Sequence, residues 1–183
     1  MKKLYFLFTL MFAFSIQSQV IITEIADPNN DSQARFIELT NIGDSAFDLT
    51  GYQLVRWTNA NTAYTTSSAV DLSEFGSLQS KGILTLANNT KFETVYGVAP
   101  TKVVGSGGPA DSNGDDNIAI LDPNGSIHDV FGVPGTDGTG QPHEFEDGRA
   151  ERKGSVTAPS STWDLNEWLS LIHISEPTRL IGI

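Results

Sequence analysis

The stretch "RFIELTNIGDSAFDLTGYQLV" (residues 35–55) holds two short hydrophobic runs joined by a segment rich in turn-forming residues. Successive side chains of a strand point to opposite faces. The first run therefore has two faces, with Phe36, Glu38 and Thr40 on one and Ile37, Leu39 and Asn41 on the other. Gly51 lets the chain turn before Tyr52 and Leu54 enter a further strand. The stretch predicts paired strands and contains no catalytic grouping.

The same pattern of short strands and turns continues along the chain. Asp122, Pro123, Asn124 and Gly125 form a turn sequence between two strand-like runs, which predicts a β-hairpin. A helix of about two turns is predicted at residues 90–97, from apolar residues three and four apart. The predicted strands cover residues 20–26, 34–42, 46–51, 51–57, 82–88, 117–121 and 126–131. We therefore expect an all-β protein, an antiparallel β-sandwich of the immunoglobulin type.

The N-terminus has the layout of a secretory signal peptide. Lys2 and Lys3 precede an unbroken apolar run at residues 4–14, and small or polar residues follow at 15–19. The run is too short for a comfortable membrane span. We expect cleavage after Ser18 and a secreted or cell-surface protein, with a retained N-terminal anchor as the alternative. The chain contains no cysteine, so thiol catalysis and cysteine-bound metal are excluded.

The chain is acidic, with a formal net charge of −11 at pH 7. Binding to a nucleic-acid backbone depends largely on Lys and Arg displacing counterions, so direct nucleic-acid binding is disfavoured. A local basic patch at "GRAERKG" (residues 148–154) is the feature that could overturn this argument.

Four segments together resemble a known family. "VIITEIADPNND", "RFIELTNIGDSAFDLTGYQLV", "GILTLANN" and "GDDNIAILDPNGSIHDVFG" are similar in order and spacing to the lamin tail domain, over residues 20–133. The resemblance implies an immunoglobulin-like β-sandwich without catalytic residues, found in nuclear lamins and in exported bacterial proteins. Bacterial members often lie beside nuclease, phosphoesterase or other hydrolase domains.

The chain after the resemblance divides into two further segments. Residues 134–168 look like an extension that packs on or flanks the sandwich at residues 19–133, with Trp163 and Trp168 as the packing residues. Residues 169–183, "LSLIHISEPTRLIGI", break the pattern and resemble a translated sequencing adapter. We expect that this tail is not native and contributes no strand, with a native short tail as the alternative.

Candidate chemical groups are few. His128 is expected on a half-exposed strand position, His173 lies in the doubtful tail, and His143 precedes Glu144, Glu146 and Asp147. His143 and these three acidic residues are nearly consecutive. Alternation along a strand would divide them between two faces, so a catalytic metal ion is not expected. We assign no catalytic, cofactor-binding or metal residues. Oxygen ligands for a structural calcium ion are the weaker alternative, at Asp27, Asp31, Asp111, Asp115 and Asp116.

These observations favour a non-catalytic exported interaction or adhesion module that binds a protein, a surface or a polymer. The alternative is the N-terminal accessory domain of a truncated exported hydrolase, a nuclease or phosphoesterase, whose catalytic domain is missing from this chain. No transmembrane segment is expected after signal cleavage.

Overall fold

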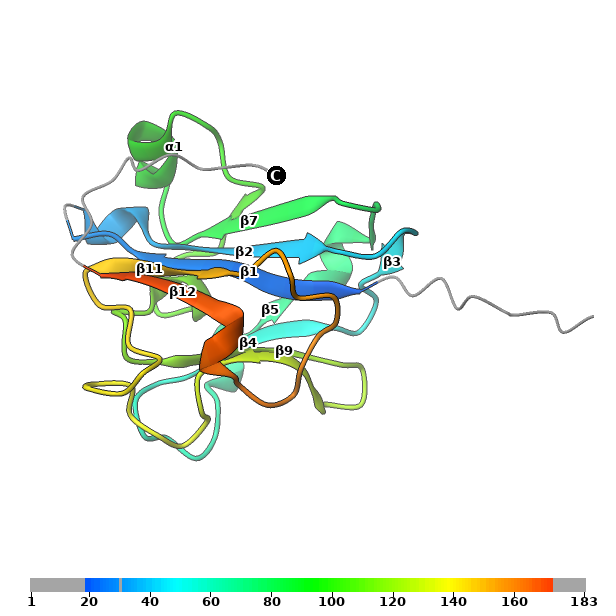
Figure 1. The fold of residues 1–183 in the computed structure, drawn as a ribbon. Coiled ribbons are helices and arrows are strands. Elements are labelled where there is room, and N and C mark those ends of the chain that lie inside the picture. The colour runs from blue at the N-terminus through cyan, green and yellow to red at the C-terminus, as the bar shows by residue number, and fades with distance from the viewer. Residues whose placement is uncertain (1–18, 30, 173–183) are drawn as a thin grey trace, which may run out of the picture.

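The computed structural model describes residues 19–29 and 31–172 and shows two facing β-sheets (Figure 1). The larger sheet has the strand order β12-β11-β1-β2-β7-β8, and the smaller has the order β10-β9-β4-β5. The larger sheet consists of β12 (Trp168–Ile172), β11 (Gly148–Arg152), β1 (Val20–Asp27), β2 (Phe36–Asn41), β7 (Ile83–Ala87) and β8 (Lys102–Val103). The smaller consists of β10 (Ile127–Phe131), β9 (Asn117–Leu121), β4 (Gln53–Trp57) and β5 (Val70–Asp71). The predicted all-β sandwich is confirmed; the β7–β8 pair is parallel, and the other pairs described are antiparallel.

Short elements complete the fold. Strands β3 (Phe47–Asp48) and β6 (Ser77–Leu78) pair with each other. The one α-helix in the described chain is α1 (Lys91–Tyr96), which confirms the helix predicted from apolar spacing. Phe92 of this helix packs edge-on against Phe36 on the outer face of the larger sheet. Single turns of 3-10 helix lie at η1 (Ser32–Ala34), η2 (Thr66–Ser68), η3 (Leu72–Phe75), η4 (Pro109–Asp111) and η5 (Leu165–Glu167).

The alternating pattern of β2 divides its side chains between two faces, as predicted. Ile37 and Leu39 are fully buried between the sheets, whereas Glu38 and Thr40 are half-buried on the outer face. Asn41 is also buried, and its amide nitrogen donates to the carbonyls of Ser45 and Leu78. One buried amide thereby holds the turn after β2 against β6, because buried polar groups must find partners.

The predicted hairpin is formed by β9 and β10. Gly51 lies next to the turn of this hairpin. Its φ of +80° is a conformation that favours glycine. A Cβ atom at Gly51 would lie 3.0 Å from Cβ of Pro123, so the site is also close-packed. The two turns that the sequence singled out therefore lie against each other.

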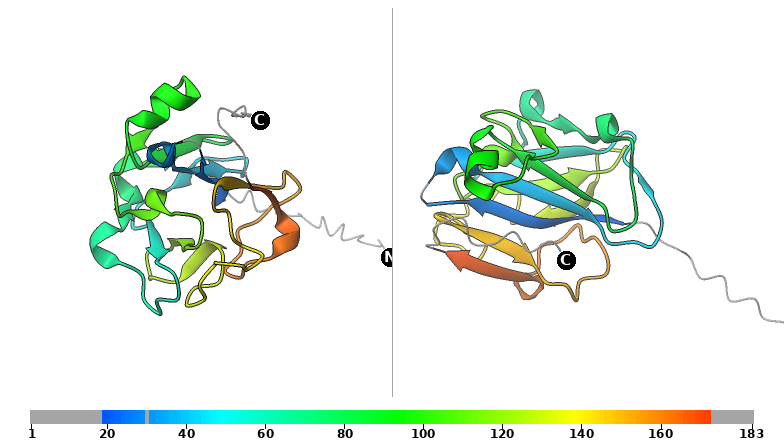
Figure 2. Two further views of the ribbon diagram at one scale, coloured as in Figure 1. Left: turned by 90° about the vertical axis from the view of Figure 1, so that its left-hand side faces the viewer. Right: turned by 90° about the horizontal axis from the view of Figure 1, so that it is seen from above.

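The extension after Val133 belongs to the larger sheet and does not merely flank it. Strand β11 pairs with β1, and β12 pairs with β11 (Figure 2). Trp168 and Trp163 both pack edge-on against Phe131, with ring centroids 4.8 Å and 6.4 Å from the Phe131 ring. The extension predicted at residues 134–168 therefore supplies a strand that covers one edge of β1, while the division of the chain at 133/134 stays a prediction.

The expectation that residues 169–183 contribute no strand fails for the first four of them. Residues 169–172 continue β12 and pair with β11, from Leu169 opposite Glu151 to Ile172 opposite Gly148. The remaining residues of that segment, His173 included, lie outside the described chain, as does the predicted signal peptide at residues 1–18. The origin of the tail stays a prediction.

The proposed basic patch at residues 148–154 is not formed. Arg149 and Arg152 are 5% and 8% exposed, and both are paired with carboxylates. Arg149 contacts Glu24 on the neighbouring strand, while Arg152 contacts Asp129 across the sandwich. Both arginines are therefore paired and little exposed, so neither offers a free positive charge to a nucleic-acid backbone.

The first four residues of β1, residues 20–23, lack a neighbouring strand on one side. Pairing with β11 begins only at Glu24, after an irregularity in the strand. Side chains from β10 fill the gap: Asp129 accepts from the Ile22 backbone N–H at 2.8 Å, and His128 Nε2 lies 3.0 Å from the Val20 carbonyl oxygen. This closure joins the two sheets.

Candidate functional site

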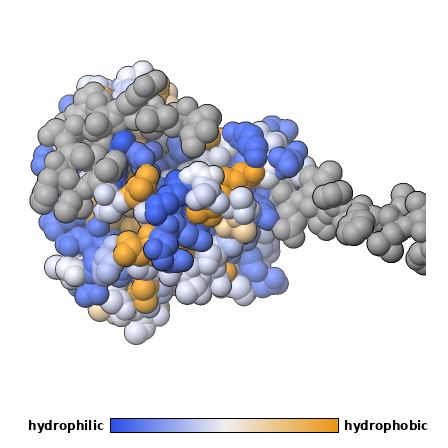
Figure 3. All heavy atoms as spheres, viewed as in Figure 1, coloured by the Kyte–Doolittle hydropathy of each residue, from blue (hydrophilic) through white to orange (hydrophobic). Residues whose placement is uncertain are grey.

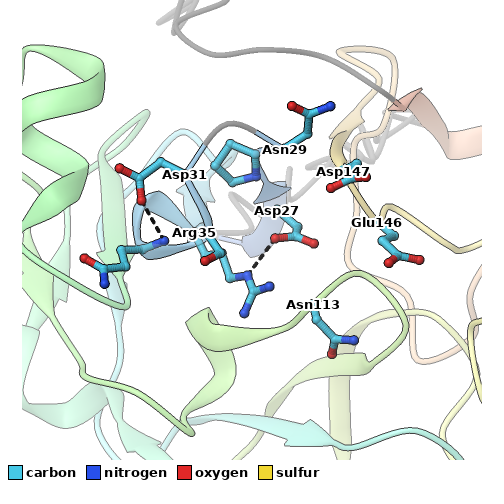
Figure 4. A pocket seen from close by; sticks show the side chains of 10 residues that line it. Asp27, Asn29, Asp31, Arg35, Asn113, Glu146 and Asp147 are labelled. Carbon is cyan, nitrogen blue, oxygen red and sulfur yellow. Dashed lines mark hydrogen bonds and ion pairs between the residues drawn. The ribbon is translucent and has the colours of Figure 1, made fainter.

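Loops from several parts of the chain surround a polar recess at one end of the sandwich (Figure 4). It has a volume of about 430 Å³ and lies where β1 ends, η1 turns and the connections before β9 and β11 approach. We call it the end recess. Its lining consists of Asp27, Pro28, Asn29, Asp31, Ser32, Gln33, Arg35, Asn113, Glu146 and Asp147.

Arg35 organises the floor of the end recess. Its Nε lies 2.6 Å from Asp27 Oδ1, and its Nη1 lies 3.3 Å from Asp111 Oδ1. Burial raises the pKa of Asp27, and the Arg35 guanidinium opposes that shift. Burial also acts to raise the pKa of Asp111. Hydrogen bonds from the Gly107 N–H, the Asn88 amide and Arg35 outweigh it, so the pKa of Asp111 is lowered. An arginine thus supplies the positive charge between two of the calcium-candidate carboxylates.

Asp31 has a backbone role at the rim. Its Oδ1 accepts from the Gln33 N–H at 3.0 Å and caps η1. Glu146 is exposed and Asp147, with a φ of +53°, is half-buried, so both present charge toward solvent. The rim is therefore acidic, while one guanidinium partly offsets the two carboxylates at the floor.

Asp115 and Asp116 lie away from the end recess and surround Asn59. The Asn59 backbone N–H donates to Asp116 Oδ1 at 2.9 Å, and its side-chain amide donates to Asp115 Oδ2 at 2.9 Å. Asp116 is also 3.1 Å from Arg56, which opposes the burial that raises the pKa of this carboxyl group. These carboxylates hold the β4–β5 loop onto the strand that follows them.

The five calcium candidates are thus divided between two places. Asp27 and Asp31 line the end recess, Asp111 meets Asp27 through Arg35, and Asp115 and Asp116 form a separate cluster. Within residues 19–29 and 31–172, no three His, Asp or Glu side chains are grouped to hold a metal ion. Calcium binding stays a prediction of the sequence.

The two described histidines pack within the fold. His128 is half-buried against Val20, and His143 is 3% exposed and edge-on to Trp163 at 5.4 Å. Burial lowers the pKa of both imidazoles. The segment from His143 to Asp147 is a turn, not a strand, since β11 begins at Gly148. His143 turns inward while Glu146 faces the end recess.

The sequence reasoning missed Arg35 as the organising residue and Asn113 as part of the lining. Arg35 lies between an Asp-rich turn and a hydrophobic strand, where an arginine can reach carboxylates on either side. Its second partner, Asp111, lies 76 residues away, a separation that no local pattern reveals.

The fold and the end recess define an immunoglobulin-like β-sandwich with a polar loop end. The family model for the Lamin Tail Domain matches residues 15–135, and the chain belongs to that family. The family consists of non-catalytic interaction domains of this fold. No curated protein matches the chain. No helix in the described part of the chain is long and apolar enough to cross a membrane.

Proposed function

We propose that this chain is an exported, non-catalytic interaction module that contacts a basic segment of a partner through the end recess. The observation that carries the proposal is the convergence of four carboxylates and one already paired guanidinium around a single concave surface. Family membership supports a binding role, and the signal-like pattern of residues 1–18 supports export.

The rest of the visible surface favours a polar mode of contact. On the face shown in Figure 3, hydrophobic side chains form small patches separated by hydrophilic ones. A large continuous apolar patch is the usual mark of a hydrophobic docking surface. Loops at the end of a rigid sandwich are the usual place for recognition, and complementary charge supplies specificity there.

A charge-reversal pair tests the proposal. The fluorescently labelled chain is titrated with a lysine-rich peptide, and with a glutamate-rich peptide of equal length, at physiological salt. The site variant is Glu146→Lys, and the control is Glu93→Lys on α1, which makes the same charge change at another exposed position. Reversal at the recess rim should weaken binding of the lysine-rich peptide several-fold, while the control binds like the parent protein.

Equal weakening in both variants would show attraction to net charge alone and would overturn the assignment to the end recess. Equal affinity for the two peptides would overturn the charge argument itself.

A further inference from the structure

A half-exposed tyrosine lies at the end of the sandwich opposite to the end recess. Tyr52 immediately precedes β4, and its ring packs edge-on against Phe47 at 5.0 Å and His128 at 5.4 Å between centroids. His128 contacts Val20 at the start of β1, whereas the end recess lies at Asp27, where β1 ends. Phe47 is buried and Tyr52 is only half-buried, so part of the tyrosine side chain faces solvent.

Two aspartates lie beside this ring. The β4–β9 register, continued by one residue, places Tyr52 opposite Asp122. Asp48 directly precedes a turn that closes with the Tyr52 N–H donating to the Leu49 carbonyl at 3.0 Å. Burial and the charges of Asp122 and Asp48 raise the pKa of the Tyr52 phenol, so both carboxylates are close enough to act on the ring.

Both carboxylates are held in place and keep their charge. Asp48 Oδ1 accepts from the Thr50 hydroxyl at 2.7 Å and from the Thr50 N–H at 3.0 Å. Asp122 Oδ1 accepts from the Asn124 and Ser126 N–H groups, each at 2.9 Å. These hydrogen bonds lower the pKa of both carboxyl groups. Neither aspartate forms a salt bridge with a lysine or an arginine of the described chain.

The chain around the ring supplies no positive charge of its own. No Lys or Arg occurs in the turn segment before β4 or in the segments beside it, which are residues 44–53, 71–80 and 121–131. The next residue, Lys81, contacts Asp44 and is turned to the loop after β2. Burial lowers the pKa of His128, so its imidazole is neutral near pH 7. An aromatic ring beside two carboxylates, with no cation of its own, attracts a cation from another molecule.

We propose that Tyr52, Asp48 and Asp122 form a second binding site, the Tyr52 site, for the guanidinium group of an arginine in a partner protein. A guanidinium is planar and stacks on an aromatic ring, and its N–H groups spread toward a carboxylate on each side. A lysine ammonium is more strongly hydrated and cannot stack, so it fits the same groups less well. The Tyr52 site does not depend on the end recess, which lies at the other end of β1.

Residue-resolved NMR tests the proposal, because it reports on the Tyr52 site and the end recess separately. The 15N-labelled chain is titrated at physiological salt with a short arginine-rich peptide, and with lysine and citrulline peptides of equal length. Citrulline has the shape of arginine without its charge. We expect amide shifts at residues 48–52 and 122–126 that saturate with the arginine peptide, are weaker with the lysine peptide and are absent with the citrulline peptide.

Four variants measure the contributions of the ring and the charge. Tyr52→Leu should weaken arginine binding at this site about two- to five-fold, while Tyr52→Phe, which keeps a ring, should bind like the parent. Asp122→Asn should also weaken binding, because the Asn side chain can still accept from the turn but carries no charge. Asp164→Asn is the matched control, since that exposed aspartate accepts from the Asn166 N–H in another turn. The dispersion of each spectrum shows whether the variant is folded.

Each result bears on one of the two sites. Equal shifts with citrulline would overturn the role of charge, and unchanged affinity in a folded Tyr52→Leu would overturn the role of the ring. Equal affinity for the lysine peptide would overturn the assignment to arginine. Shifts confined to the end recess would overturn this inference and support the proposed function, whereas shifts confined to the Tyr52 site would do the reverse. If Tyr52→Leu does not fold, Asp122→Asn and the three peptides decide on the parent fold.

Discussion

Asp129→Asn removes a buried carboxylate that joins three segments, and its effect on stability should depend on pH. Asp129 is fully buried on β10 and accepts from the backbone N–H groups of Ile22 and Ser160, at 2.8 and 2.9 Å. Arg152 reaches both carboxylate oxygens, at 3.2 and 3.3 Å. Arg152 also pairs with Glu167 at 2.6 Å, so it keeps an anionic partner in the variant.

Burial raises the pKa of Asp129 from 3.8 to about 6, against the influence of Arg152. The folded protein therefore binds a proton at this site between pH 4 and 6, where the unfolded chain has released it. Stability from this group is present in full below pH 4 and is lost as the pH rises through 6. A shift of about two pKa units corresponds to about 3 kcal/mol.

Asparagine keeps the size of the side chain and does not titrate. Its amide NH2 cannot accept, so one of the two backbone donors is left without a partner, at a cost of about 1–3 kcal/mol. At pH 4 the variant should be less stable than the parent by that amount. Between pH 4 and 7 the parent should lose about 3 kcal/mol that the variant does not, so the deficit should close or reverse.

Urea unfolding at several pH values, followed by tryptophan fluorescence, measures the difference in free energy of unfolding between the two proteins. Because other groups titrate equally in both, the difference isolates Asp129. Parallel stability profiles from pH 4 to 7 would refute the reasoning, as would a deficit that grows with pH.

Three further perturbations test other parts of the structure. Arg35→Met leaves two carboxylates without their shared cation and should cost about 2–3 kcal/mol in thermal or urea unfolding, whereas Arg35→Lys should lose less; equal losses would contradict the role of its charge. His143→Gln should flatten the fall in stability below pH 6.5, because the folded protein takes up a proton at the buried imidazole less readily than the unfolded chain; an unchanged profile would count against burial of a neutral ring. Gly51→Ala should cost about 1–2 kcal/mol in urea unfolding because of its positive φ, while Gly154→Ala, which faces open space, should cost little.

The central strands were predictable because one face of each is buried and the other is not. The run beginning at Phe36 alternates visibly, and the "DPNG" turn contains residues that suit a hairpin. Local pattern and tertiary environment agree at these positions, so a period of two is enough to find them.

Strand β11 escaped prediction because its buried residues are charged. "GRAER" has no continuous apolar face, yet Arg149 and Arg152 are buried on opposite faces of the strand, and each is paired with a carboxylate from another strand. Hydrophobic periodicity cannot report a strand whose burial depends on cross-strand ion pairs. The role of Arg35 could not be predicted for the same reason, because its place in the end recess depends on an aspartate in another loop.

The closure of β1 by side chains bears on how the protein avoids self-association. An unpaired strand edge is a template for a strand of another molecule. At Val20 and Ile22 that template is occupied by an imidazole and a carboxylate from the opposite sheet, so an incoming strand would have to expel a buried charge. The two side chains that close this edge, His128 and Asp129, are both titratable. Because burial raises the pKa of Asp129, protonation favours the closed edge, and strand exchange between molecules would begin there as the pH rises through 6.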